Sequence, residues 1–383
     1  MANPIQSKKK HHCRKASPSI DANHMTIFKD ITMSSSSQSI QDRLDASQGS
    51  QSVKIAHEKK RLISKSSTYV VFKTTDQLAE SEHKQMRDLF LRVFNKKMTK
   101  DTFDRKFFYT PKGYSYHGLM LHEKNVVGAF SAVPGRYKFF GKEHIFSLSV
   151  DTMIDPKYRG AGHIVKMANL VHQGLISDGI PFIFGFPNEH FYAFQKRLLK
   201  YTDIGELNYY VLPLNIGSVV RKLKPFNVLS RSFCKLAARF CRIPYNSKAG
   251  HGIAKVVDKQ FERHRYDASY SRISLGQATE CIYKIYEEDG GIRTLYIIDV
   301  VPLTVASLAK AVKQICRTAV KAIDIIIYVG KLPSKPAGLW KAPDSKKPQR
   351  IRMTGKILIP DVIDSTVFEM NNWSVNISDF DVR

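Results

Sequence analysis

Cysteine is scarce in this chain. Its 383 residues include five cysteines, and no two of them form a CxxC pair. A disulfide framework and a zinc site both depend on paired cysteines, so the sequence argues against either one and predicts a reducing compartment. His11, His12 and Cys13 come nearest to a metal cluster. They lie in a polar segment with no partner cluster, so we expect no metal site.

Long apolar runs are also missing. No segment reaches the roughly 20 apolar residues that a membrane-spanning helix needs, and even residues 295–305 are interrupted by Asp299 and Pro302. The basic N-terminus is not followed by an apolar segment, so it lacks the pattern of a secretory signal. We therefore expect a cytoplasmic protein, with peripheral attachment to the inner membrane face as an open alternative.

Acidic residues are few. The chain has 34 Asp and Glu against 60 Lys and Arg, a net charge of +26. This excess attracts polyanions, phosphorylated substrates or an acidic membrane surface, and it does not specify a fold. Basic tails can raise the net charge without a function, so nucleic acid is not the expected partner, although the charge does not exclude it.

The stretch between Glu206 and Asp258 contains no carboxylate at all. Apolar residues recur there at spacings of three and four, at Phe226, Leu229, Phe233, Leu236, Phe240 and Ile243. This spacing predicts a basic amphipathic helix over residues 226–243. Two interpretations remain open: the helix packs on a folded domain, or it contacts an anionic membrane surface or substrate.

Composition divides the chain into four parts. Residues 1–66 are rich in Ser, Gln and Lys and have no sustained period, which predicts a disordered tail. Residues 67–213 and 251–383 have globular patterns, and residues 214–250 form the basic linker between them. At this length two domains are expected.

Period-two and 3.6-residue patterns predict the elements of both domains. In the first domain we expect strands at 69–73, 115–121, 126–133, 137–140, 145–154 and 204–212, with helices over 78–94, after Thr99, from about 162, and up to about 200. In the second domain we expect strands at 281–286, 294–300, 323–329, 351–359 and 367–375, with a helix over 303–317.

Residues 149–164 are the most informative segment. An alternating strand ends at Pro156, and Arg159-Gly-Ala-Gly162 leads into an apolar period of 3.6 residues from Ile164. Small residues let backbone N–H groups approach an anion, and the unpaired amides at a helix N-terminus favour a pyrophosphate there. Glycines at such a turn also serve ordinary packing, so the loop alone does not identify a function.

The flanking residues of this loop resemble a known family. Asp155-Pro-Lys-Tyr-Arg-Gly-Ala-Gly162 is similar to the acyl-CoA pyrophosphate loop of the GNAT (GCN5-related) N-acetyltransferase superfamily, in which a Gln or Arg precedes spaced glycines. Residues 181–198 resemble the family's fifth strand and its next helix. The resemblance covers residues 68–214. It is closest to bacterial GNAT proteins associated with polysaccharide or cell-surface biosynthesis.

The resemblance implies a fold and a cofactor. The fold is α+β (α/β), with a mixed central sheet flanked by helices, followed by a second, degenerate GNAT-like α/β domain that lacks the cofactor loop; for the second domain this rests on element order alone. The implied cofactor is acetyl-CoA as acyl donor. Its contacts would be made by Met153, Ile154, Arg159, Gly160, Ala161, Gly162, His163, Ile164 and Asn188.

The sequence departs from the family at three positions. Ile164 stands where the loop usually ends in a small residue, Phe194 where a general-acid tyrosine is frequent, and Leu199 where a glycine precedes an aromatic residue. Phe194 cannot donate a proton, and Tyr192 is the nearest substitute. Tyr192 could equally be a half-buried helix aromatic.

Acyl transfer to an amine needs a base for the amine and an acid for the leaving thiolate. Asp151 is the best-placed carboxylate, because it lies one side-chain period before Met153 on the same strand. It could instead order the adjacent loop, just as Asn188 could simply cap a helix.

We therefore expect an acetyl-CoA-dependent N-acetyltransferase whose acceptor is an amino sugar or a related small or lipid-linked amine. One alternative is an aminoacyl-tRNA-dependent transferase of the peptidoglycan-bridge type. Another is a non-catalytic protein that binds CoA or a membrane surface.

Overall fold

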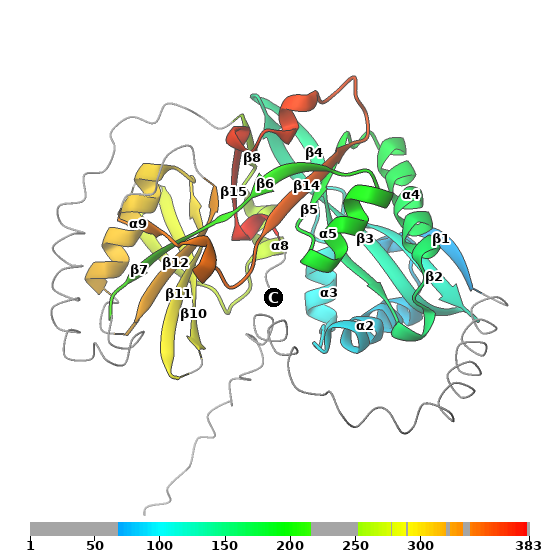
Figure 1. The fold of residues 1–383 in the computed structure, drawn as a ribbon, viewed down its shortest axis with the longest axis horizontal. Helices are drawn as coiled ribbons and strands as arrows, with labels where there is room; N and C mark the ends of the chain where they lie inside the picture. Colours follow the sequence, from blue (N-terminus) through cyan, green and yellow to red (C-terminus); the bar gives the residue numbers. More distant parts are fainter. Residues whose placement is uncertain are drawn as a thin grey trace, which may run out of the picture. The chain divides into compact units, whose positions relative to one another are not determined.

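The computed structural model describes residues 68–215, 252–276, 278–288, 290–318, 322–331 and 338–380 (Figure 1). In these residues a hydrogen-bonded path of strands forms a sheet with two halves. The first half contains, in order across the sheet, β1 (Thr68–Thr74), β2 (Tyr116–His122), β3 (Asn125–Phe139), β4 (Lys142–Ile154), β5 (Phe182–Gly185), β14 (Arg352–Ile357) and β6 (Thr202–Glu206). Only the pairing of β4 with β5 is parallel in this half.

Helices cover both faces of the first half. On one face lie α2 (Glu80–Phe94) and α3 (Lys100–Phe107), and on the other lie α4 (Ala161–Ser177) and α5 (Glu189–Leu198). Successive side chains of β2 point to opposite faces of the sheet, so Leu119 packs with α2 and α3 while Met120 packs with α4. The mixed sheet flanked by helices confirms the predicted fold class.

The second half of the sheet carries one helix in the described residues. Its strands are, in order, β9 (Ser271–Gly276), β10 (Thr279–Glu288), β11 (Ile292–Val301), β12 (Ile325–Lys331), β7 (Asn208–Pro213) and β13 (Trp340–Lys341). The apolar face of α9 (Val305–Thr318) packs through residues such as Leu308 and Ile315 on this half. Between β11 and α9 the chain has no glycine, and Thr304 caps the helix by accepting from the Ser307 N–H.

Several strands differ from the sequence prediction. β3 is one continuous strand, although Pro134 suggested a break between 126–133 and 137–140. Proline cannot donate to a ladder. β3 tolerates it because its pairing with β2 ends at Ala132 and its pairing with β8 (Ile253–Lys255) begins only at Tyr137.

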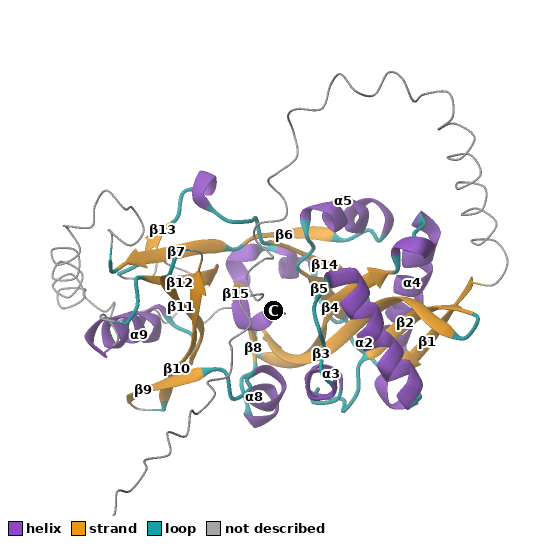
Figure 2. Cartoon of the chain, turned by 90° about the horizontal axis from the view of Figure 1, so that it is seen from below, coloured by secondary structure: helices purple, strands orange, loops and turns teal. Residues whose placement is uncertain are grey.

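Two further segments were predicted incorrectly. The expected strand 204–212 is divided at Leu207, and β6 continues through it into β7 in the other half of the sheet (Figure 2). The expected strand 367–375 consists mainly of 3-10 turns before the short β15 (Trp373–Asn376).

The strands β8, β9 and β13 and the helix α8 (Lys259–Arg265) were not anticipated. The predicted basic helix over 226–243 lies outside the described residues.

The predicted domain boundary near residue 213 is crossed by several strands. β14 inserts between β5 and β6, although it lies in the 251–383 part of the chain. β8 pairs with β3, and β15 joins β8 to β12. The described parts of 67–213 and 251–383 therefore share strands, and a core cluster containing Phe146, Trp373 and Val329 extends through both.

A buried charged cluster holds this junction together. Lys255 of β8 donates to Asp379 at 2.9 Å and lies 3.5 Å from Asp299 of β11, and its side chain is only 5% exposed. Asp299 also accepts from Tyr266 and Asn376, and Asp379 accepts from Tyr137. Burial alone would lower the pKa of Lys255, but the two carboxylates raise it above its usual value.

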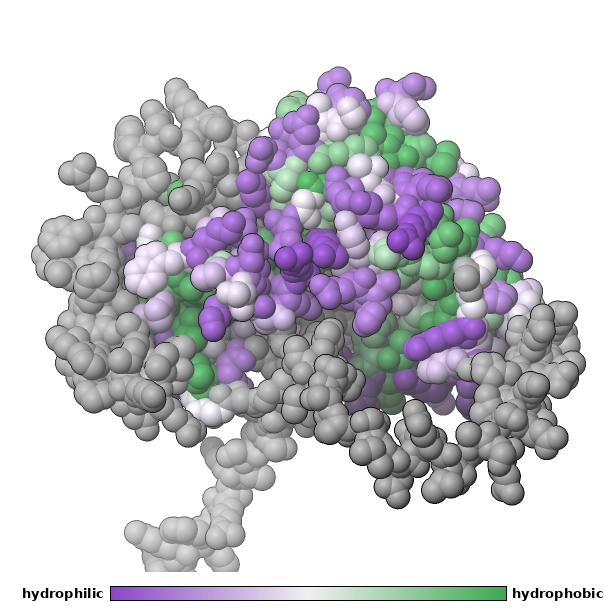
Figure 3. All heavy atoms as spheres, in the orientation of Figure 1, coloured by the Kyte–Doolittle hydropathy of each residue, from purple (hydrophilic) through white to green (hydrophobic). Residues whose placement is uncertain are grey.

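On the face of the molecule in Figure 3, hydrophilic and hydrophobic residues are interspersed over the described part of the chain. No described helix combines the length and the apolar character needed to cross a membrane.

We expect Lys255→Met to destabilise the protein strongly. The substitution leaves two carboxylates buried without their cation, a change that typically costs about 3–5 kcal/mol in free energy of unfolding. Urea denaturation of both proteins measures the difference. The matched control is Lys100→Met, which removes a lysine from an exposed pair with Asp104 and should have a much smaller effect. Equal midpoints for the two variants would contradict the role given to Lys255.

Candidate functional site

The parallel strands β4 and β5 separate in the middle of the sheet. They pair only from Phe146 with Phe182 to Ser149 with Gly185, where β5 ends. β4 continues to Ile154 and pairs there with β3 alone among the described strands. The last residues of β4 therefore present an open edge, against which an extended ligand can lie.

A β-bulge lies at the start of this open edge. Ser131 of β3 is opposite Val150 and Ala129 is opposite Met153, so Asp151 and Thr152 together face a single β3 residue. Asp151 has φ +46°, in the left-handed region that non-glycine residues seldom adopt. Bulges with this geometry bend the strand and redirect its side chains.

The Asp151 carboxylate points to α3. Its Oδ2 accepts a 2.7 Å hydrogen bond from Lys106 Nζ, and the two side chains are 10% and 4% exposed. Its Oδ1 accepts no hydrogen bond from the described residues. This oxygen can therefore take a proton or a water molecule while Lys106 holds the other one.

The turn between β4 and α4 is fixed by Asp155. Its Oδ1 accepts from the backbone N–H of Lys157 at 3.1 Å, and its Oδ2 accepts from Arg92 of α2 at 3.0 Å. Arg159 then donates to the carbonyl of Ile154. These contacts bring the N-terminus of α4 beside the open end of β4.

The N-terminus of α4 is open to an anion. Gly160 is its N-cap residue, no side chain caps the helix, and its first turn contains no acidic residue. A Cβ added at Gly162 would meet nothing within 4 Å, and one at Gly160 would only reach the His163 ring at 4.0 Å. The free amides and the positive end of the helix dipole fit a phosphate group.

The side chains of His163 and Ile164 lie in the first turns of α4, next to this anion site. His163 Nδ1 is buried and makes no hydrogen bond in the described structure. Burial and the nearby Lys166 lower the pKa of His163, so its ring is neutral near pH 7. Ile164, which departs from the family pattern, packs on the apolar cluster beneath α4. An orphaned ring nitrogen and an unobstructed helix end both suit the phosphates of a CoA cofactor.

The predicted residues of α5 have local partners. Asn188 caps this helix by accepting from the N–H of Phe191 at 2.8 Å. The Tyr192 hydroxyl donates to Asp203 of β6 at 2.7 Å, and the Arg352 guanidinium lies 4.4 Å from its ring centre. Phe194 packs partly buried on the same cluster as α4.

The structure does not bring Asp151 and Tyr192 into contact. Asp151 is bound to α3 on one face of the sheet, whereas α5 packs on the other face. Tyr192 itself is attached to β6, and β14 lies between β6 and β5. Met153 and Ile154, by contrast, lie together with Arg159 and Gly160 at the open end of β4.

Sequence reasoning missed three residues near the site. Lys106 lies on a helix with several other charged residues and gave no signal of burial. Phe380 stacks on Phe186, just after β5, with ring centres 4.3 Å apart. Arg265 of α8 donates to the carbonyl of Phe380 and so holds this C-terminal segment at the end of β5. Only the pairing of distant segments reveals these contacts.

We expect Lys106→Met to reduce stability and the double variant Lys106→Met/Asp151→Asn to recover part of the loss. The single change leaves a nearly buried carboxylate without its cation, whereas the double change removes both charges. Urea denaturation of the wild type, the two single variants and the double variant gives the free energies of unfolding for a double-mutant cycle. Strictly additive effects would contradict a direct pairing of these two side chains.

Comparison with known proteins gives a family match for part of the chain. Residues 74–197 match the family model described as an acetyltransferase (GNAT) domain. A GCN5-related N-acetyltransferase from Anabaena variabilis is 15% identical, with 75% of this chain and 73% of that chain covered at a TM-score of 0.51. One from Kribbella flavida is 12% identical, with 75% and 71% covered at a TM-score of 0.51. At these identities the two structures show a shared fold. No curated protein matches the chain.

Proposed function

We propose that this chain, whose residues 74–197 are a domain of the GNAT superfamily, is an N-acetyltransferase that uses acetyl-CoA and acts on an amine. The observation that carries the proposal is the uncapped N-terminus of α4 beside the unpaired end of β4. An anion-binding helix end next to an open strand edge suits a ligand that has phosphates at one end and an extended amide arm at the other.

The chain's own residues have separate tasks in this proposal. The amides from Gly160 to Ile164 bind the pyrophosphate, and the open backbone of Met153 and Ile154 holds the extended arm. Bound acetyl-CoA supplies an activated thioester. Asp151 accepts the amine proton on Oδ1, directly or through water, while Lys106 keeps the carboxylate in place through Oδ2.

The acceptor we propose is an amino sugar of a surface-polysaccharide precursor. Its support is the sequence resemblance over residues 68–214 and a net charge of +26, which attracts phosphorylated substrates. A membrane-bound acceptor would also suit the basic segment 226–243, and with it a cytoplasmic protein at the inner membrane face. Both of these remain predictions.

The Tyr192 hydroxyl is a weak candidate for the acid. It already donates to Asp203, whose pKa is held below its usual value, against the effect of burial, by hydrogen bonds from Lys196 and Tyr192. That arrangement ties the hydroxyl to a surface carboxylate. We therefore assign Tyr192 a positioning role for α5, and the leaving thiolate takes its proton from water while Asp151 holds the proton lost by the amine.

We expect Gly162→Glu to abolish acetyl-CoA binding while the protein stays folded. The new side chain enters open space, so the fold accepts it, but its carboxylate occupies the anion site. Calorimetric titration with acetyl-CoA measures the loss. Gly162→Gln, which adds similar bulk without charge, is the control and should weaken binding less. Undiminished affinity in the Glu variant would remove the cofactor assignment.

We expect Asp151→Asn to lower the transfer rate by roughly 10²–10⁴-fold with little change in acetyl-CoA affinity, because the amide cannot accept the amine proton. Release of free thiol across a panel of amino sugars measures the rate. Tyr192→Phe should reduce it far less. A wild-type rate in the Asp151 variant would leave this residue with a structural role only. Binding of aminoacyl-tRNA without any response to acetyl-CoA would favour the other transferase class.

A further inference from the structure

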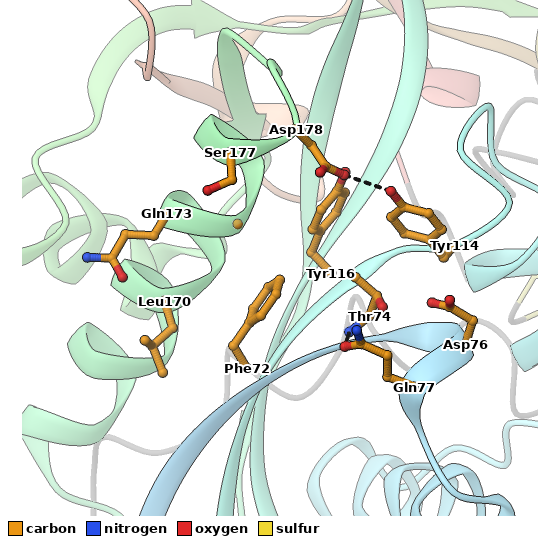
Figure 4. Close-up of a pocket in the computed structure, with 11 residues that line it drawn as sticks. Phe72, Thr74, Asp76, Gln77, Tyr114, Tyr116, Leu170, Gln173, Ser177 and Asp178 are labelled. Atoms are coloured by element: carbon orange, nitrogen blue, oxygen red, sulfur yellow. Dashed lines mark hydrogen bonds between the residues drawn. The ribbon is translucent and has the colours of Figure 1, made fainter.

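A pocket lies at the opposite end of α4 from the anion site. It measures about 480 Å³ and is lined by β1, the start of β2 and the last turns of α4 (Figure 4). α4 has 17 residues, so its ends are about 25 Å apart at about 1.5 Å per residue. The pocket is therefore separate from the site proposed for acyl transfer, and its volume is typical of small-molecule sites.

Aromatic rings form the walls of this pocket. Phe72 stacks on Tyr116 with ring centres 6.4 Å apart, and Tyr114 meets Tyr116 edge-on at 5.6 Å. Gly174 of α4 makes room for Phe72, because a Cβ there would lie 2.4 Å from the ring carbon Cζ. Helix and strand thus approach closely enough to hold the rings in place.

The polar groups of the pocket are carboxylates and neutral side chains. Asp178 accepts hydrogen bonds from both the Tyr114 and the Tyr116 hydroxyls, and both reach the same oxygen, Oδ2 (Figure 4). Lys112, outside the lining, lies 3.8 Å from that oxygen. Oδ1 accepts no hydrogen bond from the described residues. Burial alone would raise the pKa of Asp178. The hydrogen bonds from the two hydroxyls and the charge of Lys112 together outweigh that effect and lower the pKa below its usual value, so the carboxylate is ionised at neutral pH.

The second carboxylate, Asp76, is exposed at the rim of the pocket and has no ion-pair partner among the described residues. None of the eleven lining residues is Lys or Arg. In a chain with a net charge of +26, such a pocket is a local exception. Two carboxylates beside the half-buried side chains of Phe72 and Tyr114 favour a cation with an apolar stem, because the charges attract the cation and the rings offer apolar surface.

We propose that this pocket binds a small organic ammonium ion of the alkyl diamine class. One ammonium group would meet the open oxygen of Asp178, and the other would meet Asp76. The apolar stem of the ligand would lie along the aromatic wall. The proposal does not depend on acyl transfer, since the pocket shares no residue with the anion site.

Calorimetric titration of the full chain with 1,5-diaminopentane tests the proposal, and uncharged 1,5-pentanediol serves as the control ligand. We expect saturable binding of the diamine and none of the diol. Asp76→Asn should weaken binding about 10-fold through the loss of one charge contact. The matched control Glu123→Gln removes an exposed carboxylate at the far end of β2 and should leave binding unchanged.

Two further variants separate this pocket from the transfer site. Diamine binding should persist in Gly162→Glu and in Asp151→Asn, whatever becomes of acetyl-CoA binding or turnover. Loss of diamine binding in Asp151→Asn together with its survival in Asp76→Asn would place the amine at the transfer site and overturn the proposal. No saturable binding, or equal binding of the diol, would overturn it as well.

Discussion

The early end of the β4–β5 pairing is the constraint on which the candidate site depends. Their last pair, Ser149 with Gly185, leaves no space for a side chain on β5. A Cβ at Gly185 would lie 2.4 Å from the Ser149 hydroxyl. Pro187 follows and cannot extend the ladder, and Asn188 then caps α5. β4 meanwhile bulges at Asp151. One strand stops and its neighbour turns, so the open edge results from the local sequence of both.

Buried lysines hold this geometry on either side. Lys106 fixes the bulge through Asp151, and Lys255 joins the two halves of the sheet through Asp299 and Asp379. Removing such charges from water is costly, and pairing compensates for the cost only in one well-defined arrangement. We infer that these pairs contribute to a specific geometry more than to net stability. Both pairs join segments that are distant in the sequence.

The sequence predicted what depends on local pattern. The period change at Gly160 to Gly162 located the N-terminus of α4, and Thr99 and Asn188 marked helix starts that the structure confirms. It could not predict contacts between distant segments. β14 pairs with β5 although it lies about 170 residues further along the chain. Such a non-local pairing leaves no periodic trace in the sequence. Lys106 and Phe380 near the site escaped notice for the same reason.

The position of Phe380 shows how the second half of the chain bears on the first. It stacks on Phe186 directly after β5, and Arg265 anchors its carbonyl. The turn before α4 and the open edge of β4 are built from residues of the first part of the chain, including Asp155, Arg92 and the end of β5. The surroundings of the β5 end, by contrast, are built partly from the C-terminal segment. Sequence changes in that segment can therefore alter what lies beside β5 without disturbing the N-terminus of α4.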